Sequence, residues 1–202
     1  MPIHLHFFSV REVIIYSVIE AVLPDSKIVK AKEDIVLLHK WVSEQTNTKV
    51  TFKLLWQGSR DGYTAAAFHN KCNNQGATLT VIVSDKGNVF GGYTKESWGY
   101  SPSGGTYKYD STAFVYSLTH KTKCARQKNQ SYSICDGSGY GPIFGGGCDI
   151  IIVDNCNTSN YNYCRPNHSG YSSYELPPGA DNTYLAGSCN FYVKEIEVYS
   201  VT

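Results

Sequence analysis

A chain of 202 residues is long enough for one domain with a sizeable hydrophobic core. A formal net charge of +1, with 17% charged residues, does not provide the strong positive field of a nucleic-acid-binding protein, so no nucleic-acid partner is expected. Tyrosine and glycine are frequent and proline is scarce, with 16, 18 and 7 residues, a composition that suits strands and tight turns better than a helical bundle.

The cysteine content and the N-terminal sequence bear on where the protein works. Seven cysteines are an odd number, whereas secreted disulfide scaffolds are usually shorter and have an even number. The apolar segment 7–23 contains Arg11, Glu12 and Glu20, and it has neither a basic leader nor a small-residue cleavage site. Those charges also disfavour a membrane span, which requires about 20 mainly apolar residues. We therefore expect an intracellular, cytoplasmic protein with reduced thiols and no membrane insertion.

The beginning of the chain divides into two parts. Residues 1–24 are interpreted as an N-terminal extension of unknown role, because their apolar spacing fits a helix or a strand equally well. Residues 25–202 are predicted to form one domain. Its first element is an amphipathic helix of about 18 residues capped by Asp25 or Ser26. The apolar face of this helix consists of residues three and four positions apart: Ile28, Ala31, Ile35, Leu38 and Val42.

From Lys49 onward the apolar residues follow the alternating spacing of strands. A polar turn at 58–62 separates the first strand from a short helix, which Thr64 caps and which ends near Cys72. Strands are predicted at 50–56, 78–84, 89–93, 113–118, 133–135, 149–153 and 190–201.

The segments between these strands predict the fold class. The D-x-G-N sequence at 85–88 indicates a hairpin turn, and Gly- and Ser-rich loops are expected at 101–106 and 155–173. The alternation of the last strand breaks near Glu195, which indicates a bulge. Strands in series with two short helices, without alternating strands and helices, predict a mainly β (α+β) fold. We expect a two-sheet antiparallel β-sandwich flanked by short helices.

Eight short motifs occur in a characteristic order along the chain. Single glycine pairs are common in proteins, but the complete order at compatible spacings is specific, and it covers residues 26–201. The motifs are Leu54–Gly62, Ala67–Cys72, Thr78-Leu79, Val89–Tyr93, Trp98, Ala113–Leu118, Gly141–Asp149 and Leu185–Tyr199. In this order the chain resembles the TLDc domain family.

The resemblance carries expectations about fold and function. It implies a two-sheet β-sandwich with helices at its sides, acting as a protective or regulatory module linked to oxidative stress. Relatives include the oxidation-resistance proteins, and several animal members bind the cytosolic sector of the vacuolar-type proton ATPase. That sector is therefore the expected protein partner. Neither a cofactor nor a catalytic mechanism belongs to what the resemblance implies.

The motif residues are candidates for structural turns or for contact with a partner. Gly145–Gly147 precede a strand, and no helix and no Lys-Ser/Thr pair follows them, so backbone roles are expected rather than a phosphate cradle. The candidates are Arg60, Asp61, Gly91, Gly92, Gly145, Gly146, Gly147, Asp149, Gly187, Glu195 and Glu197.

Two of the polar motif positions lead to more specific expectations. In the turn at 58–62, Ser59 and Asp61 are expected to bond to nearby backbone and to cap the following helix. Arg60 is expected to pair with a carboxylate, and Asp149, Glu195 and Glu197 are the candidates.

An enzyme, either a hydrolase or a thiol peroxidase, is the alternative from a different functional class. Glu195 and Glu197 share one side of the last strand if the alternation holds, and paired carboxylates can serve acid–base chemistry. A solvated or Lys/Arg-paired sheet face explains them more simply. His69 and Cys72 lie one helical turn apart, although Cys72 is expected to be a small buried group. Cys124, in a predicted loop with Lys123 and Arg126 nearby, is the candidate reactive thiol.

Two further possibilities remain at this level. Cys148, Cys156, Cys164 and His168 offer metal ligands, but their spacings do not match a zinc knuckle, and a disulfide among these loop cysteines is the other option. The third functional class is a structural subunit of a larger cytoskeletal or ciliary assembly.

Overall fold

The computed structural model describes residues 21–99, 105–125, 131–147, 149–166 and 172–202. Most of the N-terminal extension expected at 1–24, as well as Cys148 and His168, lies outside these residues. Of the helices in the described part, none is long and apolar enough to cross a membrane.

Six strands form the first sheet, in the order β1-β12-β2-β3-β5-β6. Every pairing within it is antiparallel. The C-terminal strand β12 lies between β1 and β2, so the last strand of the sequence pairs with the first. The bulge expected near Glu195 is confirmed, because the register with β2 shifts between Val193 and Glu195. The strands are β1 Phe52–Gln57, β2 Thr78–Ser84, β3 Val89–Thr94, β5 Phe114–Ser117, β6 Thr122–Ala125 and β12 Val193–Val201.

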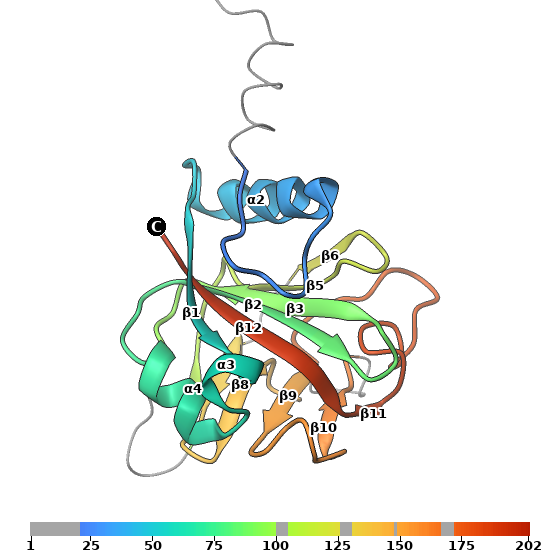
Figure 1. Cartoon of the computed structure of the whole chain (residues 1–202). Helices are drawn as coiled ribbons and strands as arrows, with labels where there is room; N and C mark the ends of the chain where they lie inside the picture. Colours follow the sequence, from blue (N-terminus) through green and yellow to red (C-terminus); the bar gives the residue numbers. More distant parts are fainter. Residues whose placement is uncertain (1–20, 100–104, 126–130, 148, 167–171) are drawn as a thin grey trace, which may run out of the picture.

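Another six strands form the second sheet, in the order β11-β10-β9-β8-β7-β4. It faces the first sheet across a shared core, and the two make an antiparallel β-sandwich as expected (Figure 1). Only Tyr192 separates β11 from β12, so the chain passes directly from the second sheet into the first. The strands are β4 Thr106–Lys108, β7 Ile134–Asp136, β8 Tyr140–Phe144, β9 Ile150–Val153, β10 Asn162–Cys164 and β11 Asn190–Phe191.

Four of these strands fall where the sequence predicts loops or no strand. β4 begins at the end of the loop expected at 101–106, and β10 lies inside the loop expected at 155–173. β6 contains Cys124, which was expected in a loop. β8 contains Pro142, and the register with β9 shifts between Tyr140 and Ile143. Each strand has three to five residues, and pairing with a neighbour supplies the order that the local pattern lacks.

The predicted helix before β1 is present, but its beginning differs. α2 spans Lys32–Thr46, and its N-cap Ala31 makes no side-chain capping bond. The expected caps are wrong: Asp25 adopts a left-handed conformation with φ 56°, and the Ser26 hydroxyl donates to Glu197. Residues 25–31 therefore form a loop that approaches the first sheet before the helix starts.

The two other described helices lie beside the sandwich. α4 spans Ala65–Cys72, and Thr64 caps it as predicted by accepting a hydrogen bond from the Ala67 N–H at 3.1 Å. The expected polar turn at 58–62 is instead a one-turn helix, α3, spanning Gly58–Asp61. α3 stands at the edge of the sandwich, where β1 ends (Figure 1).

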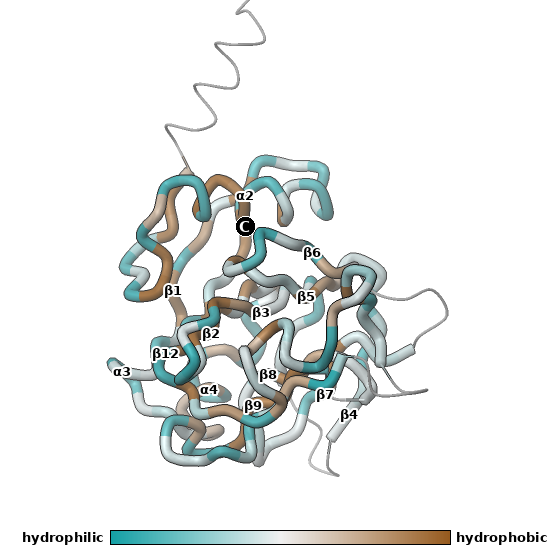
Figure 2. Tube along the Cα trace, turned by 90° about the vertical axis from the view of Figure 1, so that its right-hand side faces the viewer, coloured by the Kyte–Doolittle hydropathy of each residue, from teal (hydrophilic) through white to brown (hydrophobic). Residues whose placement is uncertain are grey.

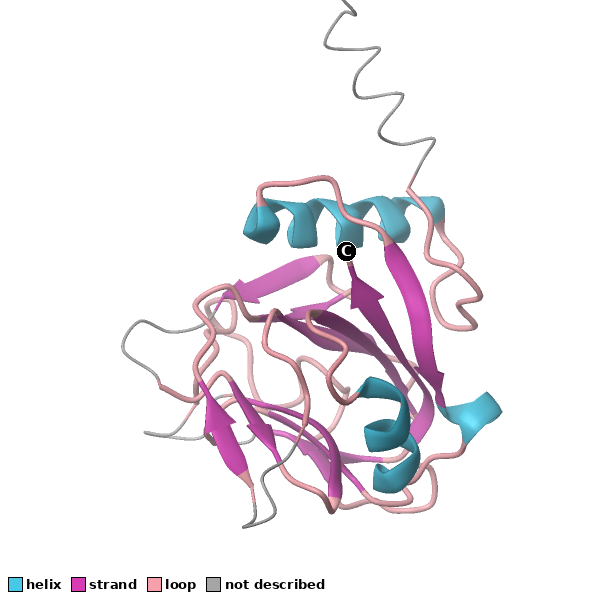
Figure 3. Cartoon of the chain, turned by 90° about the vertical axis from the view of Figure 1, so that its left-hand side faces the viewer, coloured by secondary structure: helices cyan, strands magenta, loops and turns pink. Residues whose placement is uncertain are grey.

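The first sheet is covered on both faces. α2 lies across its outer face, and the second sheet lies on the other side (Figure 3). One core fills the space between the sheets and includes Trp56, Phe90 and Phe144. Leu38 and Trp41 of α2 pack into another core on the outer face. Hydrophobic stretches accordingly follow the strands, while hydrophilic residues concentrate in the connecting turns (Figure 2).

Candidate functional site

Glu197, on the outer face of β12, is a carboxylate that accepts four hydrogen bonds. Its side chain is fully buried. Oε2 accepts from the Ser26 hydroxyl at 2.7 Å and from the Tyr199 hydroxyl at 2.9 Å. Oε1 accepts from the Lys27 N–H at 2.5 Å and from Gln57 Nε2 at 2.9 Å. Four neutral donors thus hold one carboxylate and connect the loop before α2, β1 and β12.

Glu195 has a similar role two residues earlier. The register runs unbroken from Glu195 to Glu197, so their side chains share a face of β12. Oε1 of Glu195 accepts from the backbone N–H groups of Ser59 and Ile196, each at 3.0 Å. Because Ser59 belongs to α3, Glu195 attaches α3 to the first sheet. Burial, followed by the charge of Glu195, also raises the pKa of the nearby Tyr63 to about 12.

These contacts overturn the expectation that the two glutamates lie on a solvated or Lys/Arg-paired face. Glu195 is 9% exposed and Glu197 is fully buried, and within the described ranges neither forms an ion pair with Lys or Arg. Burial, followed by the charge of Glu197, raises the pKa of Tyr199, so this phenol keeps its proton and donates it. The four hydrogen bonds hold the Glu197 carboxylate in place and occupy both of its oxygens.

Arg60 and Asp61 pair with each other rather than with the carboxylates expected for Arg60. Arg60 Nη2 lies 2.7 Å from Asp61 Oδ2 and donates to the Leu55 carbonyl at 2.9 Å. Asp61 accepts from the Gln57 N–H at 2.9 Å, which confirms its expected bond to nearby backbone. Burial acts to raise the pKa of Asp61, but hydrogen bonds from Arg60 and Gln57 hold it below its ordinary value.

The turn's other expected roles are not observed. The Ser59 hydroxyl accepts from Lys27 Nζ at 2.7 Å rather than bonding to nearby backbone. The following helix α4 is capped by Thr64. Together, Ser26, Lys27, α3, Glu195 and Glu197 form a corner of the sandwich, which we call the α3 corner.

The motif glycines lie where a side chain would collide. A Cβ on Gly91 would overlap the Thr80 carbonyl, and one on Gly92 would come within 2.6 Å of the Phe144 ring in the facing sheet. Gly91 and Gly92 are buried, so they permit close packing of the strands and sheets. The structure supports the expected backbone role for these two positions.

The remaining motif glycines belong to turns. Gly145, with φ +86°, is buried, and a Cβ there would overlap the Asp149 carboxylate. Gly146 and Gly147 are half-buried, while Gly187 is exposed and lies against Lys86. The structure does not bring Gly187 together with the α3 corner in any described contact.

Asp149 is a fully buried carboxylate of a different kind. Its Oδ2 accepts from the Ser173 N–H at 2.9 Å, whereas Oδ1 has no hydrogen-bond partner in the described structure. Burial raises the pKa of Asp149 to about 7. A half-satisfied carboxylate in this setting keeps its proton more readily than one surrounded by donors.

The residues suggested for thiol chemistry are built into the core. His69 is buried, with Nδ1 2.8 Å from Asn73 Oδ1 and Nε2 3.1 Å from the Gly137 carbonyl oxygen. Cys72 is fully buried, as expected, and burial raises its pKa. Cys124 is 2% exposed on β6, and burial raises its pKa to about 11. The expectation of an accessible, activated Cys124 is therefore wrong.

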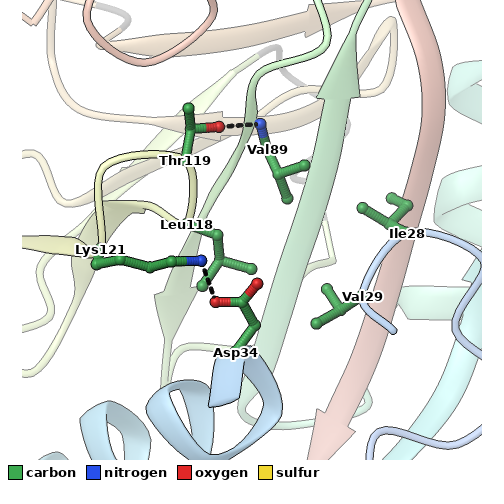
Figure 4. Close-up of a pocket in the computed structure, with 7 residues that line it drawn as sticks. All are labelled: Ile28, Val29, Asp34, Val89, Leu118, Thr119 and Lys121. Carbon is green, nitrogen blue, oxygen red and sulfur yellow. Dashed lines mark hydrogen bonds and ion pairs between the residues drawn. The ribbon is translucent and has the colours of Figure 1, made fainter. Parts of the chain in front are cut away.

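The described part of the chain shows neither a cluster of metal ligands nor a pocket of the size usual for a small-molecule site. No group of three or more His, Cys, Asp and Glu side chains is arranged to hold a metal there. A small open pocket of about 100 Å³ lies between the loop before α2 and the turn after β5; small-molecule sites usually have about 300–1,000 Å³. Asp34 and Lys121 form an ion pair across it (Figure 4).

The sequence reasoning missed the partners of the glutamates. Ser26 and Lys27 lie 171 and 170 positions away from Glu197, so no local pattern connects them. Tyr199 is the one partner of Glu197 that the sequence indicates, because it lies two residues further along the same strand and therefore shares its face.

Comparison with known proteins agrees with this architecture. A search of curated proteins found no match. The TLDc domain family model matches residues 23–202, which include both sheets and the α3 corner. The chain belongs to the TLDc domain family.

Proposed function

We propose that this chain is a non-catalytic interaction module of the oxidative-stress response, working inside the cell on the cytosolic sector of the vacuolar-type proton ATPase. The observation that carries the proposal is the family match over residues 23–202. Docking onto the pump would alter its assembly or activity.

The positions of the reactive side chains support a binding role over a catalytic one. Glu195 and Glu197 are held by backbone and neutral side-chain donors. His69 bonds to Asn73 and to the Gly137 carbonyl. Cys72 and Cys124 are buried. Each group that could carry out acid–base or thiol chemistry in the alternative hypothesis instead maintains the fold.

The α3 corner is the surface best suited to contact a charged partner. Arg60 is the exposed charged residue of the motif set, with 44% of its side chain accessible. Lys27 reaches Ser59 of α3, and Lys71 Nζ lies 3.6 Å from Asp61; both lysines are exposed. Lys194, also exposed, precedes Glu195. These cations would favour an acidic surface on the partner.

A binding experiment with the purified cytosolic sector tests this proposal. The full chain is immobilised, and affinity and ATPase rate are measured for wild type and for the triple variant Lys27→Glu, Arg60→Glu, Lys71→Glu. The matched control, Lys40→Glu, Lys86→Glu, Lys95→Glu, changes the same net charge at exposed residues elsewhere. We expect about tenfold weaker binding for the α3-corner variant and about twofold or less for the control.

The outcomes separate the parts of the proposal. If wild type does not bind the purified sector, the pump is the wrong partner. Equal losses in both triple variants would mean that net charge matters rather than the α3 corner. Tight binding without any change in ATPase rate would favour a structural subunit. Thermal unfolding of each variant shows whether the fold is intact.

A further inference from the structure

Two cysteines lie opposite each other at one edge of the second sheet. β10 and β11 pair Asn162 with Phe191 and Tyr163 with Asn190. The next step of this register places Cys164 opposite Cys189, and the Cys164 N–H donates to the Cys189 carbonyl oxygen at 2.9 Å. Both residues are free thiols in the structure.

This placement is compatible with a disulfide. Directly opposed residues of an antiparallel pair project from the same face, with Cβ atoms about 4.5–5.5 Å apart. Disulfides span Cβ separations of about 3.5–4.5 Å and Cα separations of about 4.4–6.8 Å. Forming the disulfide requires the two Cβ atoms to approach by about 1 Å, next to the two-residue strand β11. Cys164 points into the core between the sheets, so Cys189 approaches it from the rim.

The two thiols differ in access. Cys189 is half-buried, whereas Cys164 is fully buried. Burial, followed by the charges of Asp149 and Cys189, raises the pKa of Cys164 well above its ordinary value. An oxidant in the solvent therefore reacts with Cys189 first, and Cys164 is the second thiol, which reacts with the oxidised Cys189.

We propose that Cys164 and Cys189 form an oxidation site, at which a hydroperoxide converts the two thiols into one intramolecular disulfide. The Cys189 thiolate attacks the peroxide oxygen, the O–O bond breaks, and Cys189 becomes a sulfenic acid while water or an alcohol leaves. Cys164 sulfur then attacks the Cys189 sulfur and displaces hydroxide, which takes the Cys164 proton and leaves as water. In total, two thiols and one hydrogen peroxide give one disulfide and two waters.

The location of this site links oxidation to the α3 corner. β11 continues through Tyr192 into β12, the strand that carries Glu195 and Glu197. A disulfide would fasten the start of this crossing segment to β10 and close the loop 165–188. Closing a loop removes conformational freedom from the unfolded chain, so oxidation is expected to stabilise the domain. The inference concerns a reaction of the isolated chain and stands independently of any pump partner.

Mass spectrometry of the full chain provides the test. The reduced protein is treated with a small excess of hydrogen peroxide, denatured and alkylated with N-ethylmaleimide. We expect a loss of about 2 Da before alkylation, two fewer adducts than the seven of the reduced protein, and one cross-linked peptide joining Cys164 to Cys189. The thermal midpoint should rise by roughly 5 °C and return after dithiothreitol treatment.

Variants distinguish this pair from general thiol oxidation. Cys189→Ser should abolish the disulfide, and because Cys189 is half-buried this change should leave the fold intact. Cys135→Ser is the matched control: Cys135 is also half-buried, but its register neighbours are Tyr107 and Ile143. It should retain the disulfide.

Several outcomes would overturn the proposal. One is oxygen addition to Cys189 with Cys164 still open to alkylation. Another is a cross-link from Cys189 to a different cysteine. A disulfide that persists in Cys189→Ser would have the same meaning.

Discussion

The two sheets of the sandwich differ in how completely they are covered. The first sheet lies between α2 and the second sheet, so β2, β3, β5 and β12 are buried almost throughout. The second sheet is exposed at its margins: Tyr107 in the edge strand β4 is 45% exposed and Tyr140 at the start of β8 is 42% exposed, whereas Ile143 and Ile151 in its central strands are 3% and 7% exposed. A sheet buried on both faces requires long apolar strands, whereas a sheet exposed at its margins tolerates short strands containing Gly, Tyr and Asn.

The same difference applies to buried charge. On the first sheet, Glu197 receives four hydrogen bonds from three segments of the chain. Beside the second sheet, Asp149 keeps one carboxylate oxygen without a partner among the described residues. A buried carboxylate is stable when donors surround it and costs free energy when they do not. The first sheet should therefore tolerate substitution least.

Gly91→Ala should have the largest effect, because it places a methyl group against backbone at the centre of the first sheet. The new Cβ would overlap the Thr80 carbonyl and approach the Tyr116 hydroxyl to 2.8 Å. We expect a loss of more than about 4 kcal/mol in the free energy of unfolding, seen as insoluble protein or a much lower urea midpoint.

Gly139→Ala is the control, at an exposed glycine in the turn between β7 and β8. No atom lies within 4 Å of a Cβ at this position, so a change of less than about 0.5 kcal/mol is expected. Equal losses in the two variants would show that the collision with the Thr80 carbonyl is not the cause of the loss at Gly91.

Glu197→Ala should have the next largest effect. It removes the acceptor of the Ser26 and Tyr199 hydroxyls and of the Lys27 N–H. It also removes one of the two acceptors of the Gln57 amide. We expect a loss of about 3 kcal/mol in urea unfolding. Glu197→Gln preserves the shape and one acceptor and should lose less. If both variants were as stable as the wild-type protein, Glu197 would not contribute to the stability of the fold.

Asp149 should make stability depend on pH. Its pKa is raised from 3.8 to about 7, so between these values the folded state holds a proton that the unfolded state has lost. Stability is therefore greatest below the lower value and falls as pH rises toward the higher one. From about pH 5 to about pH 6.5 the expected loss is about 2 kcal/mol.

Asp149→Asn isolates this contribution, because the amide cannot titrate. Urea unfolding of wild type and variant at several pH values provides the comparison. Parallel pH profiles for the two proteins would show that Asp149 does not titrate in this range.

Glu44→Ala should have the smallest effect. Glu44 forms an exposed ion pair with Lys123, with a separation of 2.5 Å, and 42% of its side chain is accessible. Such pairs contribute little, and alanine is a good helix former, so the free energy of unfolding should change by less than about 0.5 kcal/mol. A thermal midpoint lowered by more than a few degrees would show that α2 depends on this contact.

The contrast between the sheets also explains which elements the sequence reveals. β2 is a run of β-branched and apolar residues, and its pattern is sufficient to predict a strand. β4, β8 and β10 are short, and β8 contains Gly141 and Pro142. Hydrogen bonds to neighbouring strands hold these segments extended, and their own residues show no alternating apolar pattern. The local sequence therefore predicts loops at these positions.

The candidate site was predictable only in part. The motif order identifies Glu195 and Glu197 as special positions, but their alternation in a strand suggests a solvated face. α3 and the loop before α2 bury them, and both segments are distant in sequence. Asp25 and Ser26 likewise have the composition of a helix cap. The Ser26 hydroxyl does accept the Val29 N–H at 2.8 Å, but it also donates to Glu197, and the helix begins only at Lys32. Tertiary contacts of this kind override local preferences.

Amide hydrogen exchange measured by NMR tests the central claim most directly, namely that Glu195 and Glu197 hold the fold together. The Lys27 and Ser59 N–H groups, both in loop or single-turn segments, donate to these carboxylates. They should exchange slowly in the wild-type protein, and Lys27 should lose its protection selectively in Glu197→Ala. Rapid exchange of both amides in the wild-type protein would contradict this role.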